Sequence, residues 1–378
     1  MPGLLPDVDP DGLLEYSVVF SDRALNHMSR TFQGVMNDIS RTLKHVYRGK
    51  SAIIVPGSGT FGMEAVARQF GTGRKCLVVR NGWFSYRWSQ IFDMGSIPSE
   101  SIVLKARRTE AGKTAPYAPA PIGEVVAAIR EHRPALVCAP HVETASGIIL
   151  PDAYLRAIAD EVHAVGGLFV LDCIASGALW VDMSASGVDV LISAPQKGWS
   201  SSACCALVML SERARAAIDS TMSTSFACDL KKWLQIMETY EAGGHAYYAT
   251  MPTDSLARLR DAMRELEGFG FEAAKSAQQD LGARVRKLLV AKGMTSVAAP
   301  GFQAASVVVS YTDDADIQSG RKLIDLGLQT AAGVPLQCDE PADFMTFRIG
   351  LFGLDKLRNV ERTVRKLDTA FSQLMADA

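Results

Sequence analysis

The chain has 378 residues, of which 48% are hydrophobic, so it is long enough to bury a large core and to form two domains. Its formal net charge is −2, with acidic and basic residues interspersed, which gives no basic surface for nucleic acid or for an anionic membrane. We therefore expect small molecules as partners, with no nucleic acid and no membrane.

The first residues are acidic and rich in proline, and they lack the basic and apolar segments of a secretion signal. No apolar run approaches the roughly 20 residues that a membrane helix needs. A cytoplasmic location is the resulting expectation. The seven cysteines are odd in number and have no C-x-x-C spacing, and the six histidines are scattered, so we expect reduced core thiols and no metal site.

Short apolar runs alternate with helical patterns between residues 50 and 210, after a first helical pattern over 28–47. The predicted strands cover residues 52–55, 76–79, 135–139, 168–171, 188–192 and 206–210. This alternation is typical of a mainly parallel sheet that is covered by helices on both faces. Because ligands of such sheets bind at the carboxyl ends of the strands, the residues that follow each run are candidates for a site.

A glycine-rich loop follows the first strand, with Gly57, Gly59 and Gly62 in a G-x-G-x-x-G pattern before a predicted helix over 61–70. Such a loop presents backbone N–H groups to a phosphate. A dinucleotide site also needs an acidic residue at the end of the next strand. That strand instead ends in Arg80, which in principle suits the additional phosphate of NADP. The loop predicts a phosphate site and leaves the choice of cofactor open.

Two chemically distinctive residues share one edge of the predicted sheet. Asp172 ends the strand over 168–171, and Lys197 follows the strand over 188–192. A carboxylate and an amine beside a phosphate loop indicate pyridoxal phosphate, because its chemistry needs a lysine to form a Schiff base and a carboxylate to keep the pyridine nitrogen protonated.

The pattern changes after about residue 253. Helices are predicted over 255–268, 271–289 and 355–374, and strands over 306–310 and 344–349. This part is expected to form a smaller α+β domain.

The sequence resembles the class V aminotransferases of fold type I, especially the branch with alanine–glyoxylate, serine–pyruvate and 2-aminoethylphosphonate–pyruvate aminotransferases. The motifs that carry the resemblance occur in the family's order, at 56–60 (Pro-Gly-Ser-Gly-Thr), 81–88 (Asn-Gly-Trp-Phe-Ser-Tyr-Arg-Trp), 141–147 (His-Val-Glu-Thr-Ala-Ser-Gly), Asp172, 196–197 (Gln-Lys), 247–252 (Tyr-Tyr-Ala-Thr-Met-Pro) and 347–350 (Phe-Arg-Ile-Gly). They span residues from roughly 25 to 370.

The resemblance implies an α/β architecture, the pyridoxal-phosphate-dependent transferase fold type I. In that fold a mainly parallel, seven-stranded type of sheet is sandwiched by helices and is followed by a smaller α+β domain. The expected division is an N-terminal arm over 1–24, a large cofactor-binding domain over 25–252 and a small domain over 253–378.

The resemblance also implies catalytic roles. Lys197 would form the Schiff base and move a proton between the substrate's α-carbon and C4′ of the cofactor. Asp172 would pair with the pyridinium nitrogen, and Arg348 would bind the substrate α-carboxylate through its two-pronged guanidinium. The groups that would donate hydrogen bonds to the cofactor phosphate are Ser58, Gly59, Thr60 and Gln196.

Further residues complete the implied cofactor site. Phe84 would stack on the cofactor ring, with neighbouring Trp83 as the alternative, and Thr144 would hydrogen-bond the phenolic oxygen. Tyr248 and Thr250 resemble residues that reach the phosphate of the neighbouring subunit's cofactor. They imply a homodimer with shared active sites.

Two departures from the family limit what the resemblance implies about specificity. A Pro-Gly-Pro segment near the start, which many members have, is missing from this chain. Trp199 follows the lysine where relatives often have a glycine–proline turn, and we expect this bulky side chain to reshape the site. The amino donor is therefore left open.

Three alternatives remain at this point. A cysteine desulfurase of the same fold needs a nucleophilic cysteine before the carboxylate-binding arginine, and Cys338 precedes Arg348 by about ten residues, although its acidic neighbours disfavour a thiolate. A pyridoxal-phosphate-dependent lyase would share all the cofactor residues. An NADP-binding α/β protein is the most remote alternative.

The function predicted from the sequence is a pyridoxal-phosphate-dependent aminotransferase. It would move an amino group from a small amino acid, or an aminophosphonate-like donor, to a 2-oxo acid such as pyruvate or glyoxylate by a ping-pong mechanism.

Overall fold

A seven-stranded sheet forms the centre of the protein in a computed structural model that describes residues 13–376. The strands are β1 (Ser51–Pro56), β2 (Lys75–Arg80), β3 (Glu100–Lys105), β6 (Leu136–Pro140), β9 (Leu168–Asp172), β10 (Val190–Ser193) and β11 (Cys205–Leu210). Their order in the sheet is β1-β11-β10-β9-β6-β2-β3. Only β11 runs antiparallel to its neighbours, which confirms the mainly parallel sheet.

The register of the central strands places their carboxyl ends at one edge. Asp172 of β9 pairs with Pro140 of β6 on one side and with Ile192 of β10 on the other. All residues of β6, β9, β10 and β11 are buried, as expected for strands covered on both faces. The predicted strands therefore lie as expected, and β3, whose residues are only partly buried, is an additional edge strand.

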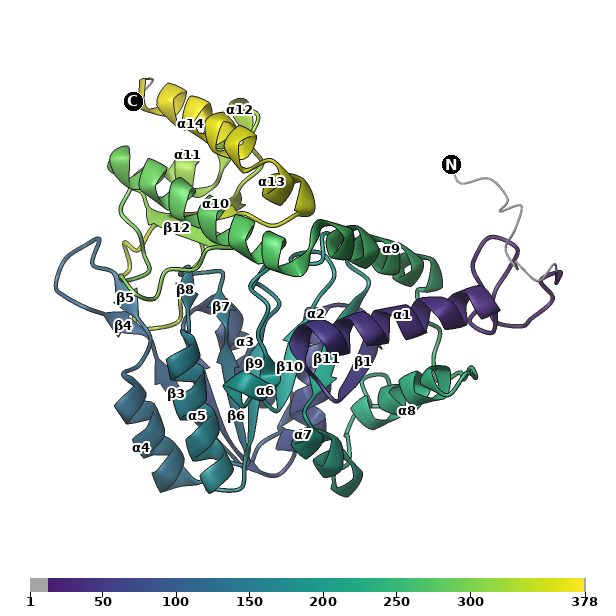
Figure 1. Ribbon diagram of the computed structural model, residues 1–378. Coiled ribbons are helices and arrows are strands. Elements are labelled where there is room, and N and C mark those ends of the chain that lie inside the picture. Colours follow the sequence, from purple (N-terminus) through teal and green to yellow (C-terminus); the bar gives the residue numbers. More distant parts are fainter. Residues whose placement is uncertain (1–12, 377–378) are drawn as a thin grey trace.

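Helices cover both faces of the sheet, with α4 and α5 in front of it and α2 and α3 behind it in the view of Figure 1. The helices of this part are α1 (Arg30–Tyr47), α2 (Gly59–Val66), α3 (Trp83–Gly95), α4 (Ile122–His132), α5 (Asp152–Ala164), α6 (Met183–Ser186), α7 (Glu212–Ala217) and α8 (Leu230–Glu241), with a π-helical turn, η1 (Ala67–Gly71), and a 3-10 turn, η2 (Ile218–Ser220). Helix α1 begins where the Ser29 side chain accepts a hydrogen bond from the Phe32 backbone, and it buries an apolar stripe that includes Met36 and Leu43.

The glycine at position 62 brings α2 close to the sheet. A Cβ atom there would lie 2.5 Å from the Cβ of Ala206 on β11, which is closer than side-chain carbons approach. Gly62 therefore allows close packing of helix on strand. This physical requirement accounts for the third glycine of the motif without any dinucleotide.

The C-terminal part lies beside one end of the sheet, in green to yellow in Figure 1. It contains an antiparallel sheet in the order β12-β14-β13. Its elements are α9 (Thr253–Phe269), α10 (Phe271–Ala291), β12 (Val307–Tyr311), α11 (Ala315–Gln318), α12 (Arg321–Asp325), β13 (Ala331–Ala332), β14 (Thr346–Gly350), α13 (Leu354–Arg358) and α14 (Val360–Ala376). The smaller α+β part is thus present as a set of elements, and its boundary at residue 252 stays a prediction.

One predicted helix is wrong as a single element. The expected helix over 355–374 is divided into α13 and α14, because Asn359 has a backbone conformation of φ −133° and ψ 51°, outside the helical region. The Asn359 side chain donates a hydrogen bond to the Asp355 carbonyl at 2.9 Å. A side chain that bonds to the backbone in this way competes with helix continuation, and the periodicity alone does not reveal it.

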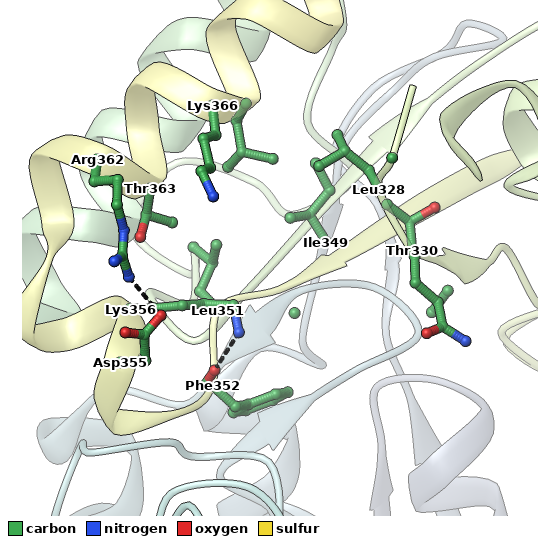
Figure 2. Close-up of a pocket in the computed structure, with 15 residues that line it drawn as sticks. Leu328, Thr330, Ile349, Leu351, Phe352, Asp355, Lys356, Arg362, Thr363 and Lys366 are labelled. Carbon is green, nitrogen blue, oxygen red and sulfur yellow. Dashed lines mark hydrogen bonds and ion pairs between the residues drawn. The ribbon is translucent and has the colours of Figure 1, made fainter. Parts of the chain in front are cut away.

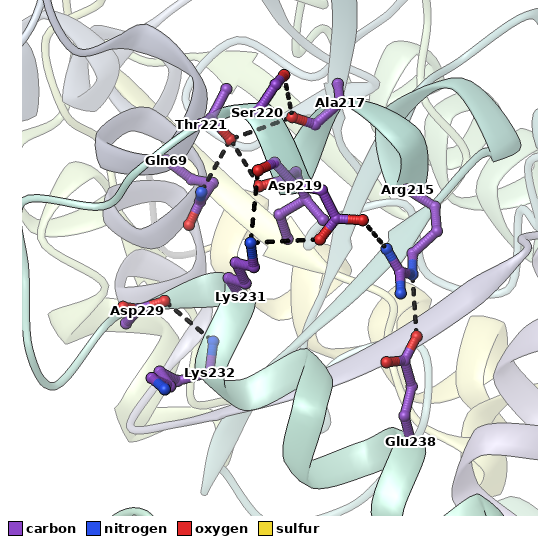
Figure 3. A network of polar contacts seen from close by, with 11 residues as sticks. Gln69, Arg215, Ala217, Asp219, Ser220, Thr221, Asp229, Lys231, Lys232 and Glu238 are labelled. Carbon is purple, nitrogen blue, oxygen red and sulfur yellow. Dashed lines mark hydrogen bonds and ion pairs between the residues drawn. The ribbon is translucent and has the colours of Figure 1, made fainter.

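A polar network joins α7, η2 and α8 (Figure 3). Arg215 contacts Asp219 at 3.1 Å and Glu238 at 2.9 Å, and Lys231 contacts Asp219 at 3.3 Å. The network fixes α8 against the elements that precede the loop over 221–229.

Among the helices of residues 13–376, none combines the length and the apolar composition that a membrane span needs. Residues 1–12 of the expected N-terminal arm lie outside that range.

Candidate active site

Lys197 lies in the loop after β10, at the edge of the sheet where the parallel strands have their carboxyl ends. The loop is tightly built, since a Cβ atom at Gly198 would lie 2.2 Å from the Gly177 carbonyl oxygen. Ser200 has φ +56°, and its hydroxyl accepts a hydrogen bond from the Leu354 backbone at 2.9 Å, which joins the loop to α13. The Lys197 amine is therefore held by a loop that is anchored to the C-terminal part.

Burial lowers the pKa of Lys197, and the positive charge of Arg348 lowers it further. Asp172 acts in the opposite direction, and Arg87 adds a smaller lowering effect. A lysine with a lowered pKa has a larger neutral fraction near neutral pH. Its amine is then available as a nucleophile or as a base.

Asp172 is the buried carboxylate of the site, with only 7% of its surface exposed. Desolvation raises its pKa to about 7, against a lowering contribution from its hydrogen bond to the Ile174 backbone at 2.9 Å. The charges of Arg87 and Lys197 also act on Asp172. The sequence prediction that Asp172 and Lys197 lie at one edge of the sheet is in agreement with this coupling.

The loop before α2 leaves backbone donors free. The N–H groups of Phe61 and Gly62 bond to the Ser58 carbonyl, whereas no bond of the Gly59 or Thr60 N–H group to another described residue is found. The Ser58 hydroxyl makes no capping bond either. A Cβ atom at Gly59 would lie 2.4 Å from a side-chain carbon of Ile174, the residue whose backbone N–H donates to Asp172. Free N–H groups at a helix start attract an anion such as a phosphate.

Phe84 stands in the first turn of α3, and Glu143 fixes it there. The buried Glu143 carboxylate accepts hydrogen bonds from the backbone N–H groups of Phe84 at 3.2 Å, Ser85 at 2.9 Å and Ala145 at 3.0 Å. Gly82 makes room, because a Cβ atom there would lie 2.7 Å from the Glu143 side chain. Glu143 is thus a positioning residue, a role that the motif over 141–147 does not indicate by itself.

Arg87 is a second residue whose role the sequence analysis missed. Its guanidinium donates to the Thr60 hydroxyl at 3.1 Å and lies 4.9 Å from the Phe84 ring centroid. It is three residues after Phe84 on α3, and residues with this spacing share a helix face. Arg87 therefore joins the phosphate-type loop to the expected stacking ring.

Arg348 belongs to β14 of the C-terminal part, and its side chain lies near Phe84, as that of Arg87 does. Its guanidinium carbon lies 5.4 Å from the Phe84 ring centroid, and its Nε donates to the Ala332 carbonyl at 2.8 Å. Trp83, the alternative stacking residue, instead contacts Tyr86, with ring centroids 5.7 Å apart. The structure thus places Phe84, rather than Trp83, beside the two arginines.

The remaining predicted residues are less closely joined to this group. Thr144 is buried next to Glu143, and Gln196 is exposed next to Lys197. Tyr248 donates to the Phe226 carbonyl at 2.6 Å, and Thr250 contacts the Tyr247 hydroxyl at 3.0 Å. In this single chain Tyr248 and Thr250 therefore bond within their own neighbourhood, and their roles stay predictions.

Two alternatives lose support from the geometry. Arg80 is buried and donates to Ser89 at 2.7 Å and to the Gln337 carbonyl at 3.1 Å, so it is engaged by the protein and is not presented to an NADP phosphate. Burial, with Glu143 and Glu340, raises the pKa of Cys338 to about 12. A desulfurase needs a thiolate nucleophile, and this thiol stays protonated.

The expectation that Trp199 reshapes the site is wrong. Its side chain is fully buried and lies among other aromatic rings, with the Trp180 centroid at 4.9 Å and Phe271 at 6.2 Å. The bulky ring fills core space behind the Lys197 loop instead. Its effect on the site is to support that loop.

The residues present fit pyridoxal phosphate. Asp172 with a pKa of about 7 matches a pyridine nitrogen, Lys197 supplies an amine of lowered pKa, and the unpaired N–H groups of Gly59 and Thr60 match a phosphate. Within residues 13–376, no cluster of three or more metal-ligating side chains is found. The group can thus hold a phosphorylated pyridine aldehyde.

Comparisons with known proteins agree with this assignment. Residues 14–334 match the sequence model described as "Aminotransferase class-V". The chain is 23% identical over 369 residues to an alanine–glyoxylate aminotransferase of Rattus norvegicus, covering 92% of this chain and 82% of that protein. It is also 25% identical over 356 residues to a protein named soluble hydrogenase, small subunit, of Synechococcus, with 93% and 88% covered.

The fold has solved counterparts as well. The crystal structure of ureidoglycine–glyoxylate aminotransferase from Bacillus subtilis superposes with a TM-score of 0.75 at 20% identity, over 95% of this chain and 88% of that one. At this identity the likeness supports the fold, not the substrate. The sequence match over 14–334 carries the family assignment.

Proposed function

Because the chain belongs to the class V aminotransferases, which depend on pyridoxal phosphate, we propose that it transfers the amino group of a small amino acid to a 2-oxo acid, with glyoxylate as the preferred acceptor. The observation that carries the proposal is the position of Arg348, whose guanidinium lies beside Phe84 and acts electrostatically on Lys197. Two of the compared relatives are named for glyoxylate, which supports this acceptor.

Substrate binding would depend on Arg348. A guanidinium binds a carboxylate through two parallel hydrogen bonds, and both an amino acid and a 2-oxo acid carry a carboxylate next to the reacting carbon. Arg348 would therefore hold either substrate in the same orientation, with that carbon near the Lys197 amine. The Ala332 carbonyl, which accepts from Arg348 Nε, fixes the direction of the guanidinium.

The catalytic steps would depend on Lys197 and Asp172. Pyridoxal phosphate supplies, when bound, an electron-withdrawing ring that stabilises negative charge on the substrate carbon. The neutral Lys197 amine would take the proton from that carbon and deliver it to C4′ of the cofactor, which suits a group whose pKa is lowered by burial and by Arg348. Asp172 would hold a proton between its carboxylate and the pyridine nitrogen.

The cofactor would be held by the residues around these two groups. Ser58, Gly59 and Thr60 would bind the phosphate at the start of α2, and Arg87 would fix the Thr60 hydroxyl for that contact. Phe84 would stack on the ring. The roles of Thr144 and Gln196, the phenolic oxygen and the phosphate respectively, rest on the sequence motifs alone.

We also propose a homodimer with shared active sites, in which Tyr248 and Thr250 reach the partner's phosphate site. The exposed rings of Phe226 and Tyr247, 74% and 52% accessible, lie beside them and support burial against a second copy. Sedimentation over a range of protein concentrations checks the dimer, and a monomer at all concentrations would exclude shared sites. The cytoplasmic location stays a prediction from the sequence.

Product analysis tests the proposed reaction. The cofactor-loaded protein should convert alanine and glyoxylate into pyruvate and glycine in equal amounts, without release of ammonia. Serine and aspartate are the alternative donors to compare. Formation of ammonia in place of glycine would instead identify a lyase.

A further inference from the structure

A cavity lies in the C-terminal part, between α14, the segment before β13 and the turn after β14 (Figure 2). Its volume is about 530 Å³, which is within the range of small-molecule sites. None of the residues assigned above to catalysis, cofactor or substrate lines it. The cavity is therefore a separate feature of the molecule.

The walls of the cavity are apolar and its rim is cationic. Leucine and isoleucine side chains form the walls, and the rim carries the cations Lys356, Arg362 and Lys366 against one carboxylate, Asp355. Arg362 is already paired with Asp355 at 2.5 Å, and Lys356 donates to the Phe352 carbonyl at 2.8 Å. The rim thus has an excess of positive charge.

Lys366 is the cation that stays available. It forms neither an ion pair nor a hydrogen bond with any other residue in the described part of the chain. Figure 2 shows its amine pointing from α14 into the space opposite Leu328 and Ile349. An unpaired ammonium above an apolar wall is complementary to a molecule with an apolar body and one acid group.

We propose that this cavity binds an amphipathic organic carboxylate, with its apolar body against Leu328, Ile349 and Leu351 and its acid group at Lys366. The site is distinct from the substrate site at Arg348. The ligand would be a regulator and not a reactant, because the cavity contains no group that performs the chemistry.

Two contacts connect the cavity to the active site. Phe352 lines the cavity, and its ring centroid lies 4.9 Å from the Lys197 amine. Ala331 also lines it and pairs with Arg348 across the β13–β14 ladder. A ligand that shifts Phe352 or β13 would change the surroundings of both Lys197 and Arg348. This regulatory coupling rests on the proposed function, whereas binding itself does not.

Calorimetric titration of the cofactor-loaded protein with octanoate tests binding. We expect one octanoate per chain, and binding weaker by roughly tenfold in Lys366→Gln, because one charge-assisted hydrogen bond is lost. Lys287→Gln is the matched control, since Lys287 is an exposed lysine of α10 away from the cavity, and it should leave the affinity unchanged. The neutral analogue 1-octanol should bind more weakly than octanoate in the unmodified protein only.

Several results would overturn the proposal. Absence of saturable octanoate binding, or equal affinity in Lys366→Gln and in Lys287→Gln, would show that the cavity does not bind the acid as described. Loss of octanoate binding in Arg348→Ala alone would place the ligand in the substrate site. Because heat of binding needs no turnover, these outcomes differ from failure of the transamination proposal.

The coupling has its own readout. Octanoate should shift the visible absorption of the bound cofactor in the unmodified protein, and in Lys366→Gln the same shift should need a roughly tenfold higher octanoate concentration. An unchanged spectrum with octanoate bound would overturn the regulatory part of the proposal.

Discussion

The guanidinium carbon of Arg348 lies 5.4 Å from the centroid of the Phe84 ring, although one residue belongs to the C-terminal sheet and the other to the first turn of α3. Phe84 is fixed by Glu143, and Arg348 is fixed by the Ala332 carbonyl. The C-terminal sheet and helix α3 thus contact each other at the Phe84 ring. The proposed substrate site depends on this contact between Arg348 and Phe84.

Replacement of Arg348 by alanine should weaken carboxylate substrates selectively. We expect KM for the amino donor to rise by roughly 10- to 100-fold, because a charge-assisted interaction with the carboxylate is lost, while kcat changes less. Arg348→Lys should recover only part of the affinity, since an ammonium cannot form the two parallel bonds. Steady-state kinetics measure KM and kcat, and Arg365→Ala, a substitution of an exposed arginine, is the control. Equal KM values in Arg348→Ala and Arg365→Ala would show that Arg348 does not bind the substrate carboxylate.

Replacement of Lys197 by alanine should abolish turnover. We expect a decrease in kcat of about a thousandfold or more, because both the attachment point of the cofactor and the proton carrier are removed. Absorption spectroscopy and product assays give the two readouts, and Lys287→Ala serves as the matched lysine control. Full activity in Lys197→Ala would contradict the mechanism.

Glu143→Gln should destabilise the protein and disturb Phe84 without removing a group that touches substrate. In the unmodified protein, three backbone N–H groups donate to the two carboxylate oxygens of Glu143. The amide of glutamine has only one acceptor oxygen, so a buried N–H group then lacks a partner. We expect a loss of about 2 kcal/mol in the free energy of unfolding. Urea denaturation measures it, with the exposed Glu131→Gln of α4 as control; a change no larger than that of the control would show that Glu143 is dispensable.

The raised pKa of Asp172 predicts a pH dependence of stability in the cofactor-free protein. The folded state takes up a proton on Asp172 with a pKa of about 7, whereas the unfolded carboxyl has its ordinary value of 3.8. Between these values the folded state binds more protons, so this contribution is present below about pH 4 and is lost as the pH rises through about 7. Its size is at most about 4 kcal/mol.

The measurement is denaturation of cofactor-free protein between pH 5 and 8, compared with Asp172→Asn. The difference in unfolding free energy between the two proteins should change across that range, since the asparagine does not titrate. Bound cofactor should remove most of the dependence, because a protonated nitrogen then faces the carboxylate. Parallel pH profiles in both cofactor-free proteins would contradict the assignment.

The positions of most central strands and their mainly parallel arrangement could be anticipated from the sequence, because apolar runs bounded by loops carry a local signal, whereas the strand order and the antiparallel direction of β11 could not. Asp172 and Lys197 could be placed at the same edge for the same reason. The division between α13 and α14 could not be anticipated, since it depends on the backbone conformation of Asn359. Edge strand β3 was missed because its residues are only partly buried.

The missed site residues depended on contacts between distant segments. Arg87 belongs to the motif over 81–88, but its bond to Thr60 joins two helices that the sequence does not place relative to each other. Glu143 caps a helix that begins about 60 residues earlier, so local spacing gives no indication of it. Trp199 was misjudged because the direction of its side chain is set by the packing of Trp180 and Phe271.

Transamination at this site is best tested by the visible absorption of the cofactor-loaded protein, followed while single amino donors are added without an acceptor. We expect one small amino acid to remove the absorption of the bound aldehyde cofactor stoichiometrically and glyoxylate to restore it, with no such response in Lys197→Ala. Release of ammonia with no recovery on adding glyoxylate, or an absorption that no donor changes, would contradict the assignment of this site to transamination.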